Sequence, residues 1–140
     1  MRFVDTNIII RYLVRPTTPA DQTRHQACVD LFRRIKDGQE HVTTTEAVIA
    51  EVLFVLTSRR QYNLTHHDAA ARVRPIIALR SLKISHKRVY LRALELFSTY
   101  NFLDFEDAII IAQMERLKLR ELYSYDTDFD PIRGISRQQP

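Results

Sequence analysis

Residues 41–56 read HVTTTEAVIAEVLFVL, and this stretch decides the fold class. His41–Thr44 is typical of a short strand, and the threonine run to Glu46 opens a helix that we expect to end near Arg60. A strand followed at once by a helix is the repeating unit of parallel sheets. The pattern recurs along the chain, so the sequence predicts an α/β protein with a mainly parallel sheet.

The other elements follow from apolar spacing and from residues that cap helices. Strands are expected at Arg2–Asp5, Leu82–Ser85 and Leu122–Tyr125. Helices are expected at Asn7–Val14, from Pro19 (capped by Thr18) to just before Gly38, from Thr65, at His86–Thr99 and from Asp104. Cys28 lies on the apolar stripe of the second helix and is predicted to be a core residue. Pro75 should kink its helix or begin a new turn. The tail from Asp130 is polar.

Length and composition exclude several classes of protein. The 140 residues fit a single domain, which we expect to span residues 1–140. Only two glycines are present, which excludes the glycine-rich loops of P-loop and Rossmann nucleotide-binding proteins. The single cysteine excludes an intramolecular disulfide and a cysteine-based zinc cluster. No signal peptide or membrane span is visible, so we expect a cytoplasmic protein without membrane contact.

The charge balance favours a polyanionic partner. The chain has 21 basic and 17 acidic residues, a net charge of +4, and 17 of the basic residues are arginines. The arginine guanidinium is a rigid fork that suits phosphate oxygens. A solvated surface rich in arginine is the alternative interpretation, so charge alone leaves nucleic acid as one of two possibilities.

Two carboxylates follow predicted strands. Asp5 ends the first strand and Asp126 follows the last. Active sites in open parallel sheets form beyond the carboxyl ends of the strands, so we expect both side chains at the same edge. Taken singly, each could equally be a helix cap or a turn former.

Two further carboxylates lie on apolar helix faces. Glu51 is the only acid in the run Ala47–Leu56, and a helix so apolar is expected to be buried nearly all round. A buried carboxylate needs a cation or an arginine partner. Asp107 shares its stripe with Leu103, Ile111 and other apolar residues, whereas the dipole of its helix could also explain its place in the first turn.

Together these acids predict a metal site. Clustered carboxylates repel one another unless a hard cation neutralises them, and Mg²⁺ or Mn²⁺ takes oxygen ligands. Asp128, two residues after Asp126, could be a fifth acid in the cluster. Without these five acids, the chain carries 12 acidic and 21 basic residues. An acidic pocket in a basic shell is what a metal-dependent nuclease requires.

Four ordered motifs make the chain resemble the PIN-domain family, specifically ribonucleases of the VapC toxin type. They are Val4–Asn7, Ala50–Leu53, Phe105–Ala108 and Ser124–Phe129, and their order and spacing cover essentially the whole chain. The resemblance implies a three-layer α/β/α sandwich around a central parallel sheet. It also implies a homodimer and neutralisation by a small antitoxin protein.

The resemblance further implies the reaction and its residues. Asp5, Glu51, Asp107 and Asp126 would be catalytic and would hold Mg²⁺ or Mn²⁺ for hydrolysis of phosphodiesters in tRNA, rRNA or mRNA. Asp128 would be a further metal ligand, although the last motif varies within the family. Thr6 and Asn7 match positions that support the first aspartate.

Alternatives to an RNA-cleaving toxin are a different class of enzyme or a binding module. A non-catalytic RNA- or antitoxin-binding module with this fold would also explain the basic shell. A phosphatase of the haloacid-dehalogenase type needs an aspartate two residues after the first, and Asn7 stands there. The five histidines are scattered, and His66-His67 does not have the spacing of metal ligands.

Overall fold

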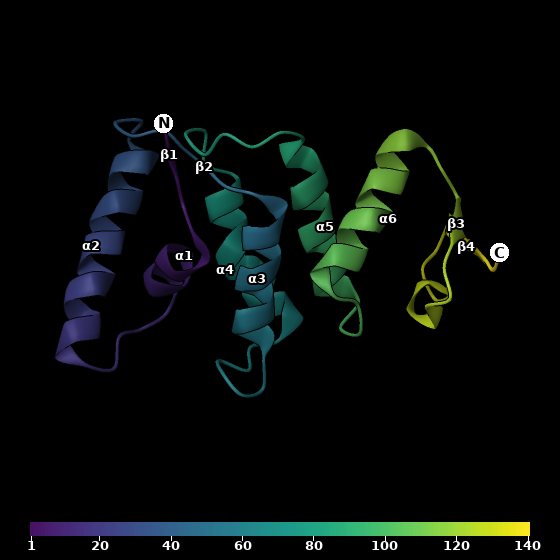
Figure 1. Cartoon of the computed structure of the whole chain (residues 1–140), viewed down its shortest axis with the longest axis horizontal. Coiled ribbons are helices and arrows are strands. Elements are labelled where there is room, and N and C mark those ends of the chain that lie inside the picture. The colour runs from purple at the N-terminus through teal and green to yellow at the C-terminus, as the bar shows by residue number, and fades with distance from the viewer.

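A computed structural model describes residues 1–140, and its helices outweigh its strands (Figure 1). The strands are short: β1 (Arg2–Phe3), β2 (Val42–Thr43), β3 (Glu121–Tyr123) and β4 (Ser136–Gln138). The helices are α1 (Thr6–Leu13), α2 (Pro19–Lys36), α3 (Glu46–Thr57), α4 (His66–Ile77), α5 (Lys87–Thr99) and α6 (Phe105–Leu117), with a 3₁₀ turn η1 (Thr127–Phe129). None of the helices combines the length and apolarity needed to cross a membrane.

The helix starts are set by side chains that satisfy free backbone amides. Thr18, Thr45, Thr65 and Asp104 each accept a hydrogen bond from the amide three residues further on. These helix starts confirm the sequence prediction. Pro75 lies inside the last turn of α4, and the helix continues past it to Ile77.

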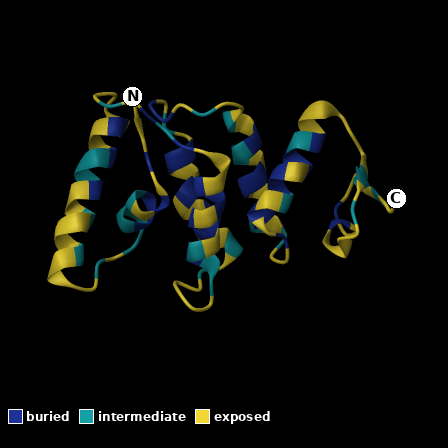
Figure 2. Ribbon diagram, in the orientation of Figure 1, coloured by how far each residue is buried: buried dark blue, intermediate teal, exposed yellow.

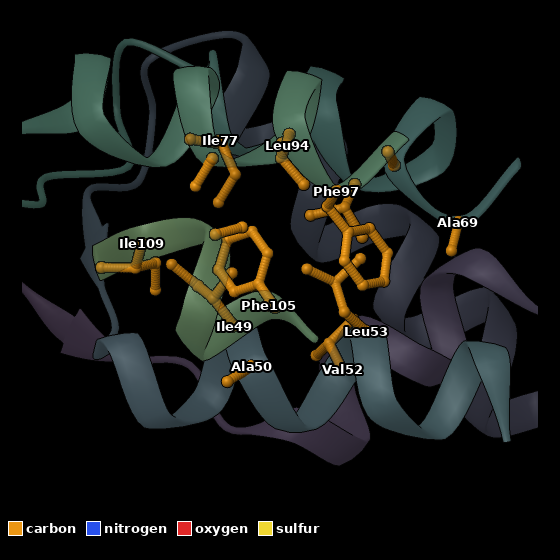
Figure 3. Packing of buried hydrophobic residues seen from close by; sticks show 14 of the residues in the cluster. Ile49, Ala50, Val52, Leu53, Ala69, Ile77, Leu94, Phe97, Phe105 and Ile109 are labelled. Atoms are coloured by element: carbon orange, nitrogen blue, oxygen red, sulfur yellow. The ribbon is translucent and has the colours of Figure 1, made fainter. Parts of the chain in front are cut away.

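The apolar core lies between helices. Leu53 and Leu56 of α3 are fully buried, and α3 packs against α1, α4 and α6. Figure 3 shows α3 residues meeting Phe97 of α5 and Phe105 of α6 across this core. Cys28 is buried, as its stripe predicted. The central position of α3 means that it fixes how the neighbouring helices sit.

The strands form two separate parallel pairs, which fit the α/β class but do not show the one central sheet that the sequence predicts. β1 pairs with β2, and Val42 also bridges to Leu82, which is all that remains of the strand expected at Leu82–Ser85. β3 pairs with β4, an element that the sequence did not predict. Figure 1 shows the two pairs at opposite ends of the molecule.

The position of α6 explains this separation. Only residues 118–120 join the end of α6 to β3, so β3 must begin close to where α6 ends. Six buried residues hold α6 in the core. The β3–β4 pair therefore lies beside α6, away from β1–β2, and is largely exposed (Figure 2).

The packing of α3 predicts unequal effects of two adjacent substitutions. Leu53 is fully buried and Phe54 is 69% exposed. Leu53→Ala should lower the free energy of unfolding by about 2–5 kcal/mol, because it leaves a cavity in the core. Phe54→Ala, the matched control on the same helix, should change it by less than about 1 kcal/mol. Urea unfolding followed by circular dichroism measures both, and equal losses would contradict this packing.

Candidate metal centre

The first carboxylate pair forms where β1 turns into α1. Asp5 is exposed and occupies the N-cap position of α1 without a side-chain hydrogen bond to the helix, and Asn7 Nδ2 donates to Asp5 Oδ2 at 3.3 Å. Thr6 is buried, and its Oγ1 donates to Glu51 Oε2 at 2.7 Å. This hydrogen bond ties the β1–α1 turn to α3. Asp5 therefore directly precedes the residue that contacts Glu51.

Glu51 is exposed, which corrects the expectation that α3 is buried nearly all round. Ala47, Glu51 and Phe54 lie four and three residues apart and form an exposed face of the helix. The apolar composition of α3 misled the prediction, because the apolar residues Ala47 and Phe54 are on this open face. Glu51 has its Thr6 partner there and no arginine partner.

The second group gathers at the start of α6. Asp104 Oδ1 accepts from the Asp107 amide at 3.0 Å, and Asp107 is half-buried. Asp126 Oδ1 accepts from the Asp128 amide at 2.8 Å, which closes the turn into η1. Asp126 and Asp128 are both exposed. Their charges act on Asp107, so the third and fourth motifs lie near each other.

Burial raises the pKa of Asp107 to about 7, and neighbouring carboxylates add to the effect. The charge and hydrogen bond of Asp104 come next, followed by the charges of Asp126 and Asp128. A carboxylate whose pKa is raised this far lies among like charges, with too little water around it to screen them. A divalent cation would relieve that repulsion.

The two groups meet only in part: Glu51 and Asp104 line one groove, and no three of the acidic side chains are placed to hold a metal ion. The expectation that Asp5 and Asp126 share one sheet edge is wrong here, because their strands belong to different pairs. The donors themselves, all carboxylates, suit a hard divalent cation. Each group is thus chemically suitable and geometrically incomplete.

Two acidic residues near the site were assigned other roles from the sequence. Asp104 was expected only to cap α6, and Glu106 to be an outer residue. Both line a groove of about 520 Å³ together with Glu51, between α3 and the start of α6. The Asp104–Asp107 spacing of three residues was the available signal, since it places both on one face of the helix.

A basic groove borders the first group. It has a volume of about 270 Å³ and is lined by Asn7, Arg11, Arg15 and Tyr62, among others. Arg11 Nη1 pairs with Asp21 Oδ1 at 3.1 Å, whereas Arg15 is exposed and forms no ion pair. Asn7 contacts Asp5, so the basic groove and the acidic pair are continuous.

The raised pKa of Asp107 predicts a pH-dependent stability. Folded Asp107 keeps a proton that the unfolded chain releases between about pH 4 and pH 7, so the group destabilises the fold increasingly as pH rises through that window. In EDTA, Asp107→Asn should therefore raise the thermal unfolding midpoint more at pH 8 than at pH 5. Differential scanning calorimetry measures this, and an equal effect at both pH values would contradict it.

Comparison with known proteins identifies the family. Residues 2–135 match the PIN domain. No curated protein matches the sequence significantly. The match covers nearly the whole chain and agrees with the α/β elements described above. The chain therefore belongs to the PIN domain family, whose fold is of a nuclease type.

Proposed function

We propose that this protein is a metal-dependent endoribonuclease that hydrolyses RNA phosphodiester bonds. The observation that carries the proposal is the carboxylate group around Asp107, whose pKa rises to about 7 among Asp104, Asp126 and Asp128. A half-buried carboxylate whose pKa is raised by burial and by neighbouring carboxylates is a candidate functional group. The PIN domain match adds that members of this family typically use divalent metal ions.

Asp5, Glu51, Asp107 and Asp126 would hold Mg²⁺ or Mn²⁺, with Asp128 as a further ligand. Bound metal supplies an activated water and stabilises charge on the phosphate. Thr6 orients Glu51 through its 2.7 Å hydrogen bond, and Asn7 orients Asp5. A shared site needs β3–β4 to lie beside β1, which would also complete the central sheet of a three-layer sandwich.

RNA is the substrate best suited to the surface beside Asp5. The basic groove offers an arginine without an ion pair and an aromatic ring, Tyr62, which is 42% exposed. Arginine binds phosphate, and exposed tyrosine stacks on unpaired bases. The net charge of +4 supports the same partner.

The VapC-type resemblance extends the proposal to a biological role. The protein would be the toxin of a toxin–antitoxin pair, active as a homodimer in the cytoplasm and neutralised by a cognate antitoxin. The groove between α3 and α6 is open and partly apolar, with Phe54 at its rim, and is a suitable surface for an antitoxin segment.

A non-catalytic RNA-binding module is the second candidate. It is favoured by the separation of the two carboxylate groups, since neither alone is placed to hold a metal. Such a module would retain RNA equally well after Asp5→Asn and would give no product at any metal concentration.

The nuclease proposal predicts discrete RNA fragments. Metal-stripped protein is incubated with tRNA and rRNA, with Mg²⁺ or Mn²⁺ added. Asp5→Asn and Asp107→Asn should each lower the cleavage rate by at least about 100-fold, because each removes a metal ligand. Asp30→Asn, on the exposed side of α2, is the matched control and should cleave like the wild type.

Three results would argue against it. Fragments that persist in both variants would indicate a contaminating nuclease. Fragments that persist in EDTA would exclude metal dependence. RNA that is retained but never cut, with either metal, would favour the binding module.

The basic groove predicts a separate effect on RNA affinity. Arg15→Ala should weaken binding to single-stranded RNA and reduce the slope of log affinity against log salt by about 1, because it removes one phosphate contact. Arg80→Ala, in the loop after α4, makes the same charge change away from the groove and is the control. Fluorescence anisotropy at several salt concentrations measures both. Equal effects of the two substitutions would mean that Arg15 contributes only its charge and that the groove is not a specific RNA-binding site.

A further inference from the structure

Both strand pairs have unpaired edges, including the outer edges of β1, β3 and β4. β1 has only β2 as a neighbour, and β3 has only β4. Phe3 on β1 is 57% exposed and Tyr123 on β3 is 75% exposed. Unpaired edges with apolar side chains attract a further strand. A groove of about 540 Å³ runs along β3, between it and the linker from α6.

The free edges have matching hydrogen-bonding patterns. The amides of Arg2 and Val4 bond to the β2 segment, so the amide and carbonyl of Phe3 point to the open side. On β3, the carbonyl of Arg120 and the amide of Ser124 bond to β4. Because backbone groups alternate in direction along a strand, the amides and carbonyls of Glu121 and Tyr123 point to the open edge of β3.

These patterns fit one parallel register. With Phe3 opposite Leu122, the Phe3 amide meets the Glu121 carbonyl, and the Tyr123 amide meets the Phe3 carbonyl. The register also places the apolar side chains of Phe3 and Leu122 together. Asp5 then stands opposite Ser124, two residues before Asp126.

The same chain cannot make this pairing while α6 stays in the core. The three-residue linker reaches about 14 Å from the end of α6. Figure 1 shows α3 and α5 between β1 and α6, and each helix is about 10 Å wide. β3 of one chain would therefore reach its own β1 only if α6 gave up its six buried residues.

The exposed surface of the chain is as large as an exchanged dimer requires. The accessible area is 9001 Å². A compact protein of this mass exposes about 7,600 Å², so the excess is roughly 1,400 Å². A stable interface buries about 800 Å² on each partner. The excess is enough for each chain to bury one strand pair against a second copy.

We infer that two copies of this chain exchange their C-terminal strand pairs, so that β3 of each copy pairs with β1 of the other. Two-fold symmetry makes the exchange reciprocal and creates two identical sites. In each site, one chain contributes Asp5 and Glu51 and the other contributes Asp107, Asp126 and Asp128. The catalytic role of these sites rests on the proposed function, whereas the strand exchange does not.

A disulfide test reports the exchange without any activity. Phe3→Cys and Leu122→Cys are combined in a Cys28→Ala background, because these positions face each other in the register. Oxidation should give a species of twice the 16.5 kDa chain mass on a non-reducing gel. Phe3→Cys alone is the control and should remain at the mass of one chain.

Other outcomes would overturn the inference. A disulfide within one chain would change the gel mobility of the double variant without doubling its mass. That result would mean that β3 pairs with β1 of the same chain. No disulfide would exclude the register. Phe3→Pro provides a second check, since it removes the outward amide and keeps both amides that bond to β2. It should convert the dimer to a monomer by light scattering, whereas Phe3→Ala should remain dimeric.

Complementation links the exchange to the site. Asp5→Asn and Asp126→Asn chains, each inactive, are refolded together in equal amounts. Half of the dimers are mixed and contain one intact site, so about a quarter of wild-type cleavage should return. No recovery, with each variant dimeric, would mean that each site comes from one chain. A doubled mass in the disulfide test with an inactive wild type would leave the exchange standing and reject the nuclease.

Discussion

Burial of one side of α3 is the constraint on which the rest of the structure depends. Leu53 and Leu56 are fully buried, and α3 packs against α1, α4 and α6, so these helices share one core. The opposite side of the same helix presents Glu51 to the solvent. Thr6 donates a hydrogen bond to Glu51 of α3, so α3 also positions the turn that contains Asp5. Core packing and the candidate site thus share one helix.

The carboxylates show how the site balances charge against burial. Asp107 is half-buried at the start of α6, where the amides of the first turn favour negative charge. Burial, followed by the charges of the surrounding aspartates, outweighs that effect and raises the pKa of Asp107 to about 7. An arrangement that costs stability without a cation is consistent with a role in binding one, and the nuclease-type fold of the PIN domain family supplies the context.

The division of the acids into two groups follows from the reach of the chain. A linker of three residues keeps Asp126 with Asp107, while the Thr6–Glu51 contact keeps Asp5 with α3. Each group is locally well held, and β1 and β3 each keep a free edge in their two-stranded sheets. In the proposed exchange, the pairing that completes the sheet would also complete the metal centre.

The sequence by itself determined the α/β class and the helix starts, and it predicts which acids form the site. Caps such as Thr18 and Thr65 act on amides three residues away, so local sequence contains that information. Only the tertiary structure decided that Glu51 is exposed, that Asp107 is raised in pKa and that the strands form two pairs. Burial and strand pairing depend on residues far apart in the chain, and two- or three-residue strands have too little apolar pattern of their own to specify a partner.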